Sequence, residues 1–331
     1  TEESKLKFLE AVEKALEERQ VYLERLAAEK RAKILERAVA YFNSEYVNNS
    51  GTSIVSYKAE GIEETAEGKY TIPSIINVKS DELKGAYRTY KLNVYISEGY
   101  YGIQVDEDRT FAQSNLVHIR NDYDAIIDLD RQIAANEKKI EGVSKSLFKA
   151  YKAYVATLDM AVKHNDLKAT IAARNSLLDM HNDIFAFVEK QNELQKGDAE
   201  ISSKYASEKE FLKAYSTYMK SRDLSWGPTG AVARIDGFLA VQKGVHEYIG
   251  KVAQIREMDA EVSSKSAAYA DVLKAYTAYA KTRDLAWTPE WSLEKLDGYL
   301  KVQNELLTFI AKLGEIKGAD AEIASKCAEL K

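Results

Sequence analysis

Apolar residues recur every three or four positions along residues 2–42, a spacing typical of an amphipathic helix. The stripe consists of Leu9, Val12, Leu16, Leu23, Leu26, Ile34, Ala38 and Phe42. This segment contains neither proline nor glycine, and it predicts a single helix roughly 60 Å long. A helix of that length needs a partner, so we expect it to pair antiparallel with a helix that starts near residue 118.

The hydrophobic period changes from 3.6 to two within residues 43–117. Alternate positions are apolar in residues 90–96, and residues 53–57, 70–78 and 101–105 are further strand candidates. Pro73 has no N–H group to donate, so its strand is expected at a sheet edge or starting after the proline. The pattern predicts a small antiparallel β domain inserted between two helical segments.

From residue 118 onward the helical pattern returns and contains an internal repeat. The motif Lys-Ala-Tyr-x-x-Tyr occurs at residues 149–154, 213–218 and 274–279. The later motif Asp-Ala-Glu begins at Asp198, Asp259 and Asp320, which are equally spaced, and we call this interval one repeat length. Each copy predicts a helix, a turn and a second helix whose apolar seam must be covered by a neighbour. We predict three such repeats, at about residues 135–197, 198–258 and 259–320.

The fold class that follows is mostly α with a small antiparallel β insertion. It comprises a long N-terminal helix (1–42), an inserted β domain (43–117) and a helical-repeat domain (118–331) shaped as a rod. The apolar phase favours helices that continue through Asp198, Asp259 and Asp320 into the following repeat. The alternative is a break at Gly197, with Asp198 as the next N-cap.

The turns of the repeats hold the candidate binding residues. Residues 222–226 and 283–287 are near-copies of Arg-Asp-Leu-x-Trp, and all three tryptophans of the chain lie in or beside them. The candidates are Arg222, Asp223, Trp226, Arg283, Asp284, Trp287 and Trp291. Aromatic loops of this kind can form a platform for a partner. Alternatively, each Trp closes the end of its own hairpin while Asp and Arg cap the turn.

Composition removes several functional classes. The 47 basic and 52 acidic residues give a net charge of −5, which is not the basic footprint of a nucleic-acid-binding protein. No apolar run is long enough for a transmembrane segment. One cysteine and four histidines leave little material for a metal site, and repeat alignment places His181 against Gln242 and Gln303, an ordinary polar position. The sequence also has no phosphate-binding glycine loop, so we expect no cofactor.

We therefore predict a non-catalytic binding or scaffold protein. It would present a β tip, which is the inserted β domain (43–117) at the tip of the predicted helical hairpin, and aromatic helix-turn loops to a protein partner. One alternative is a receptor for a small ligand, peptide or glycan on the Trp/Tyr surface. Another is a hydrolase with a dispersed carboxylate site that uses Asp223 or Asp284. The first residue is not Met and cysteine is scarce, which favours a periplasmic or cell-surface location.

Overall fold

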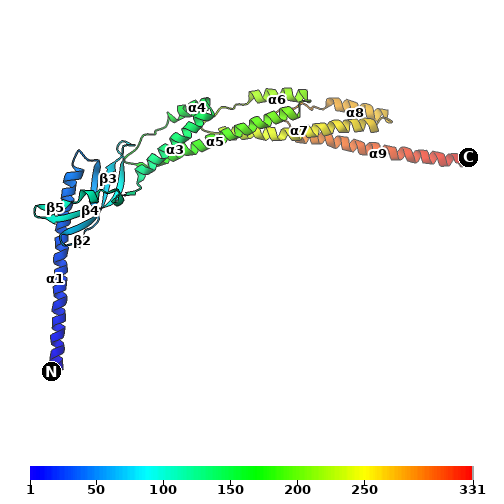
Figure 1. Ribbon diagram of the computed structural model, residues 1–331. Coiled ribbons are helices and arrows are strands. Elements are labelled where there is room, and N and C mark those ends of the chain that lie inside the picture. Colours follow the sequence, from blue (N-terminus) through cyan, green and yellow to red (C-terminus); the bar gives the residue numbers. More distant parts are fainter. Residues whose placement is uncertain (330–331) are drawn as a thin grey trace. The chain divides into compact units, whose positions relative to one another are not determined.

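The computed structural model describes residues 1–329 (Figure 1), so the last two residues of the predicted repeat domain, 330–331, lie outside the described residues. Within this range the protein is 67% helical, with nine α-helices and one six-stranded antiparallel sheet. The predicted class, mostly α with a small antiparallel β insertion, is confirmed.

The elements follow one another in a simple order. The helices are α1 (Glu2–Phe42), α2 (Glu107–Thr110), α3 (Asp122–Val143), α4 (Lys145–Val155), α5 (Leu167–Lys204), α6 (Lys209–Ser221), α7 (Ala231–Lys265), α8 (Ala270–Thr282) and α9 (Leu293–Glu329). The strands are β1 (Ile54–Ala59), β2 (Glu63–Ala66), β3 (Lys69–Lys79), β4 (Tyr87–Gly99), β5 (Gly102–Val105) and β6 (Val117–Ile119).

The chain forms two compact units. The sheet unit consists of Thr1–Lys139 with Leu158–Asp179, and the helical unit consists of Ile140–Thr157 with the described residues from Met180 onward. Helices α3 and α5 contribute residues to both units.

Strands β3 and β4 form the centre of the sheet and pair along the full length of β3. Strands β1 and β2 pair with successive parts of the outer edge of β3, and β5 and β6 pair with the two ends of β4. Alternate residues of β3 and β4 are buried on one face, as the period of two predicts. This face carries Tyr70, Ile72, Ile76, Leu92, Val94 and Ile96.

Pro73 lies inside a central strand, so the prediction that its strand is an edge strand or begins after it is wrong. Its missing N–H is tolerated because β1 ends its pairing at Ser74 and β2 begins its pairing at Thr71. The carbonyl of Pro73 accepts a hydrogen bond from the Glu60 backbone N–H at 2.7 Å, in the connection between those two strands. Pro73 therefore lies at the point on the edge of β3 where the pairing with β2 has ended and the pairing with β1 has not yet begun.

Helix α1 packs on the sheet through its C-terminal third only. Ile34, Ala38 and Phe42 are buried against the apolar face of β3 and β4, and the Phe42 ring stacks on Tyr57 with centroids 4.1 Å apart. Residues 1–33 are exposed. The predicted antiparallel pairing of α1 with the helix that follows the sheet is wrong, because α1 packs against β1 and β5 and not along α3.

The helical unit alternates short helices (α4, α6 and α8) with long ones (α5, α7 and α9). The long helices continue through Asp198, Asp259 and Asp320, so the break considered at Gly197 does not occur. They do not continue into the next short helix, because α5 ends at Lys204 and α7 at Lys265, each before a short turn. A core of α5, α6, α7 and α9 side chains includes Ile201, Tyr215, Val245, Ile255 and Leu296.

Candidate functional site

A partly buried carboxylate joins three helices of the helical unit. Asp198 of α5 accepts hydrogen bonds from the Tyr215 hydroxyl of α6 at 2.6 Å and from the Gln242 amide of α7 at 2.8 Å. Arg222, in the loop after α6, forms an ion pair with the same carboxylate. The Arg222 side chain is 4% exposed and that of Asp198 is 15% exposed, so the pair is largely shielded from solvent and links the three helices.

The same contacts recur one repeat length further on. Asp259 of α7 accepts hydrogen bonds from the Tyr276 hydroxyl, from Arg283 at 2.6 Å and from the Gln303 amide at 2.6 Å. Gln242 and Gln303 each also donate to a carbonyl of the preceding long helix, both at 2.8 Å. The guanidinium-bearing side chain of Arg283 is 3% exposed. We call these two sets the Asp198 network and the Asp259 network.

His181 takes the corresponding position in α5. Its side chain is buried, and its Nε2 lies 2.7 Å from the Tyr151 hydroxyl of α4. Repeat alignment correctly matched His181 with Gln242 and Gln303. The prediction that these are ordinary polar positions did not include their burial. All three are at least nine-tenths buried, and sequence spacing alone does not report burial of a polar side chain.

The electrostatics of the Asp259 network keep its groups in fixed protonation states. Burial raises the pKa of Tyr276 to about 12, and the hydrogen bond to Asp259 adds to this effect. Burial alone would raise the pKa of Asp259, but hydrogen bonds from Arg283 and Tyr276 outweigh it and lower the pKa. The carboxylate is therefore ionised and the phenol neutral at physiological pH, which suits a permanent structural contact.

The turn aspartates shape the loops that follow the short helices. The Asp223 carboxylate accepts from the Ser225 backbone N–H at 2.9 Å, and Asp284 accepts from the Ala286 N–H at 3.1 Å, which is the geometry of an Asx turn. The pKa of Asp223 is lowered by hydrogen bonds from Ser225, and that of Asp284 by the backbone hydrogen bond and Lys295. An ionised acceptor of this kind is a poor general acid.

Trp287 lies in the core. Its ring is 4% exposed and packs edge-on against Phe211, Tyr215 and Tyr218, with centroid distances of 5.6, 5.4 and 5.6 Å. Trp226 and Trp291 are half-buried. Trp291 packs against Tyr248 with ring centroids 5.5 Å apart.

Trp287 also forms one wall of a groove of about 600 Å³ between α6, α7 and the loop 285–289, which we call the α6–α7 groove. Its walls are largely apolar and include Ala214, Val252 and Ala253. Arg256 and Glu208 form an ion pair of 2.9 Å at its edge. The Trp287 Nε1 and the Tyr218 hydroxyl are buried without a hydrogen-bond partner among the described residues.

A second groove, of about 340 Å³, lies between α4, α5 and loop residues 224–226, and we call it the α4–α5 groove. Trp226 and Leu224 line it, one repeat length before Trp287 and Leu285. In both grooves the leucine carbonyl of the loop accepts a side-chain hydrogen bond, from Gln191 at 2.9 Å and from Tyr248 at 2.6 Å. The two donors are not at corresponding positions, since Gln191 corresponds to Val252 and Tyr248 to Phe187.

The structure thus divides the residues predicted as binding residues. Arg222 and Arg283 belong to the buried networks, and Asp223 and Asp284 form the turns. The three tryptophans differ in exposure, as described above. Only the two aspartates lie as in the alternative in which Asp and Arg cap the turn, because each arginine pairs with a carboxylate on the preceding long helix. Trp287 packs on α6 and does not close the end of its own hairpin.

Sequence reasoning missed two exposed aromatic residues. Tyr100 and Tyr101 are 96% and 94% exposed at the β4–β5 turn, and their rings meet edge-on. Gly102, with φ of 127°, follows them in a backbone conformation that favours glycine. The sequence could have indicated this, because two consecutive tyrosines between Gly99 and Gly102 predict a turn, and a turn exposes both of its central side chains.

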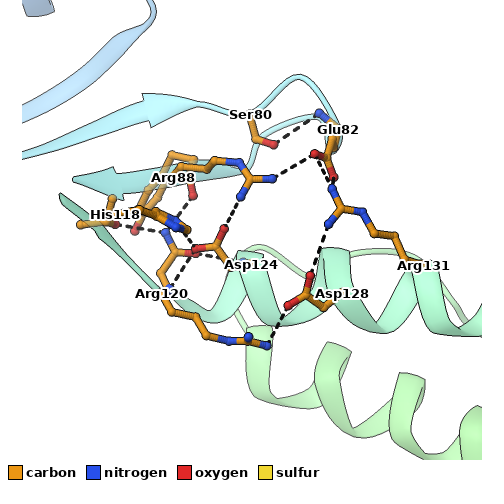
Figure 2. Close-up of polar contacts among 11 residues, drawn as sticks. Ser80, Glu82, Arg88, His118, Arg120, Asp124, Asp128 and Arg131 are labelled. Carbon is orange, nitrogen blue, oxygen red and sulfur yellow. Dashed lines mark hydrogen bonds and ion pairs between the residues drawn. The ribbon is translucent and has the colours of Figure 1, made fainter. Parts of the chain in front are cut away.

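A separate polar cluster lies in the sheet unit (Figure 2). Asp124, at the start of α3, accepts from Arg88 of β4 at 2.7 Å and lies 3.1 Å from the His118 Nε2 of β6. Glu82, in the β3–β4 loop, is bonded to both Arg88 and Arg131. Because these carboxylates already have basic partners, we interpret the cluster as a structural link between the sheet and α3.

Residues 1–329 contain no group of three or more His, Cys, Asp or Glu side chains arranged to hold a metal ion. In the same range, no helix is long and apolar enough to cross a membrane. Compared with known protein families, curated proteins and solved structures, the chain has no significant match.

Proposed function

We propose that the protein is a non-catalytic binding or scaffold protein that engages a protein partner. Its helical unit would act as an array of similar helical hairpins, each made of a short helix, a turn loop and a long helix. The recurrence of the Asp198 contacts at Asp259, in the same geometry one repeat length later, supports such a helical repeat.

The observation that carries this proposal is a contrast between two sets of residues. The frame, which consists of the Asp198 and Asp259 networks, is the same in both places, whereas the residues of the groove walls differ. Three positions that are Gln191, Asn192 and Gln195 in the α4–α5 groove correspond to Val252, Ala253 and Arg256 in the α6–α7 groove. The frame residues keep their hydrogen bonds, while one groove is rich in amides and the other apolar. Repeat proteins recognise partners in this way, with contact residues that vary on a fixed scaffold.

The turn between β4 and β5 is the part of the β domain that we propose contacts a partner. Large aromatic side chains are costly to leave in water and are enriched in protein interfaces. The almost complete exposure of Tyr100 and Tyr101 therefore supports a second contact region for a partner, in the sheet unit.

Blocking one groove without disturbing the frame tests the proposal. Ala253 and Ala260 are both exposed on α7, but only Ala253 lines the α6–α7 groove. We expect immobilised full-length protein to retain a partner from its native source, and to lose it with Ala253→Trp but not with Ala260→Trp. Equal retention by both variants, confirmed with the purified partner, would refute groove recognition.

A receptor for a small ligand is the second candidate, and the volume and largely apolar lining of the α6–α7 groove favour it. A cavity of this size with a few polar groups is typical of small-molecule sites. Titration with sugars or peptidoglycan fragments would then change the fluorescence of Trp287.

A further inference from the structure

The C-terminal half of α9 exposes the residues that α7 buries at corresponding positions. Tyr248, Ile255 and Val262 of α7 are 4%, 0% and 0% exposed. The residues one repeat length later are Phe309, Ile316 and Ile323, which are 50%, 59% and 60% exposed. In α5, the residues one repeat length before the α7 set, Phe187, Leu194 and Ile201, are 1%, 1% and 0% exposed.

The aspartate of each long helix shows the same contrast between α9 and the two earlier helices. Asp198 and Asp259 each receive a tyrosine, an arginine and a glutamine from the next hairpin. Asp320 is the corresponding residue of α9, and it is exposed with no hydrogen-bond or ion-pair partner among residues 1–329. The apolar stripe and the acceptor are thus both present on α9 without the donors that satisfy them elsewhere.

We propose that this α9 face, defined by Phe309, Ile316, Asp320 and Ile323, binds a helical hairpin of the same pattern on a partner protein. The hairpin would place an arginine and a tyrosine on Asp320 and a glutamine on the preceding turn of α9, with apolar residues over the stripe. The argument rests on the helical repeat proposed above and on continuity with the α7–α9 interface. It does not depend on what the grooves bind.

A second copy of this chain fits the face less well than a separate hairpin. The donors that this chain carries in α6 and α8, with the arginines that follow them, are already bonded to Asp198 and Asp259. A folded second copy could offer them to Asp320 only by breaking its own buried ion pairs. The matching partner is therefore a hairpin whose tyrosine, arginine and glutamine are not yet engaged.

The chain itself supplies a probe with the required chemistry. A synthetic peptide with the sequence of residues 269–308 contains Tyr276, Arg283 and Gln303 in the spacing that covers α7. Cys327 is the sole cysteine and is exposed, one helical turn after Ile323. An environment-sensitive fluorophore on Cys327 of the full chain therefore reports binding to this part of α9.

Three single substitutions on α9 make the test specific. Asp320→Asn and Ile316→Asp alter the proposed face, whereas Glu315→Gln removes one charge from a position whose α7 equivalent, Gln254, is exposed. All three residues are exposed, so the variants should fold. We expect Asp320→Asn to weaken peptide binding at least about tenfold, Ile316→Asp to abolish it, and Glu315→Gln to leave it unchanged.

The alternative outcomes overturn the proposal. Absence of a fluorescence change at peptide concentrations on the order of 100 µM, corresponding to an affinity weaker than about −5.5 kcal/mol, would show that the face does not accept such a hairpin. Binding that ignores Asp320→Asn and Ile316→Asp would place it elsewhere. Self-association of the labelled chain that Ile316→Asp abolishes would identify a second copy as the occupant instead.

Discussion

The Asp259 network makes a quantitative prediction about stability. Asp259→Asn keeps the shape of the side chain but removes the charge that balances Arg283, which is 3% exposed. Breaking a buried pair by neutralising one partner costs about 3–5 kcal/mol. The Asp259 side chain is 29% exposed, so solvent relieves part of this cost. We therefore expect Asp259→Asn to lower the free energy of unfolding by about 3 kcal/mol, at the lower end of that range.

Asp320→Asn is the matched control, because this residue holds the corresponding place on α9 and is exposed. It should change stability by no more than about 0.5 kcal/mol. All three tryptophans lie in the helical unit, so denaturant unfolding followed by tryptophan fluorescence reports that unit. A loss for Asp259→Asn no larger than that for Asp320→Asn would refute the reasoning.

Two further measurements isolate the ion pair. Adding Arg283→Met to Asp259→Asn removes the unbalanced charge, so the double variant should lose less stability than the two single losses combined. The pKa of Asp259 is lowered by its partners, so its contribution is present above the unfolded pKa of about 4 and is lost as pH falls through the folded pKa. The difference in free energy of unfolding between wild type and Asp259→Asn should therefore become smaller below about pH 4.

Other variants probe separate features. Gly244→Ala places a Cβ 2.5 Å from the Trp291 ring, whereas Gly250→Ala on the same helix meets nothing within 4 Å, so calorimetry should show destabilisation for the first and a gain of about 0.5–1 kcal/mol for the second. The pKa of Tyr276 is raised to about 12, so its contribution is complete below the unfolded pKa of about 10 and is lost between about pH 10 and 12, and Tyr276→Phe should remove that alkaline loss. Asp124→Asn removes the charge of a buried carboxylate that pairs with Arg88, and should lower the unfolding midpoint of the sheet unit measured by circular dichroism.

Sequence periodicity predicted the elements well because it is a local property. The helix over residues 2–42, the alternation around Leu92 and the equally spaced Asp198 and Asp259 landmarks all appear in the structure at the expected places. Whether an apolar stripe is buried, however, depends on which other element packs against it, and that element can be distant in the sequence. Leu16 and Leu92 both lie in clear apolar patterns, yet Leu16 is 57% exposed and Leu92 is 2% exposed.

The candidate site shows the same limit. The Arg-Asp-Leu-x-Trp loops were recognised from their composition, but the burial of Arg283 depends on Asp259, 24 residues earlier in another helix. The position of Pro73 likewise depends on where two other strands end. Such partners are set by tertiary packing, which a single sequence does not reveal.

Each network places its carboxylate in one hairpin and its donors in the next, and this arrangement has a consequence for how the helical unit opens. Neighbours that share such an ion pair protect each other's amides, whereas the turns of α9 around Ile323 have no such neighbour among residues 1–329. We expect amide hydrogen exchange to be fastest near Ile323 and to slow progressively toward Val262 and Ile201. The α8–α9 hairpin would then open and re-form while the α6–α7 hairpin remains intact.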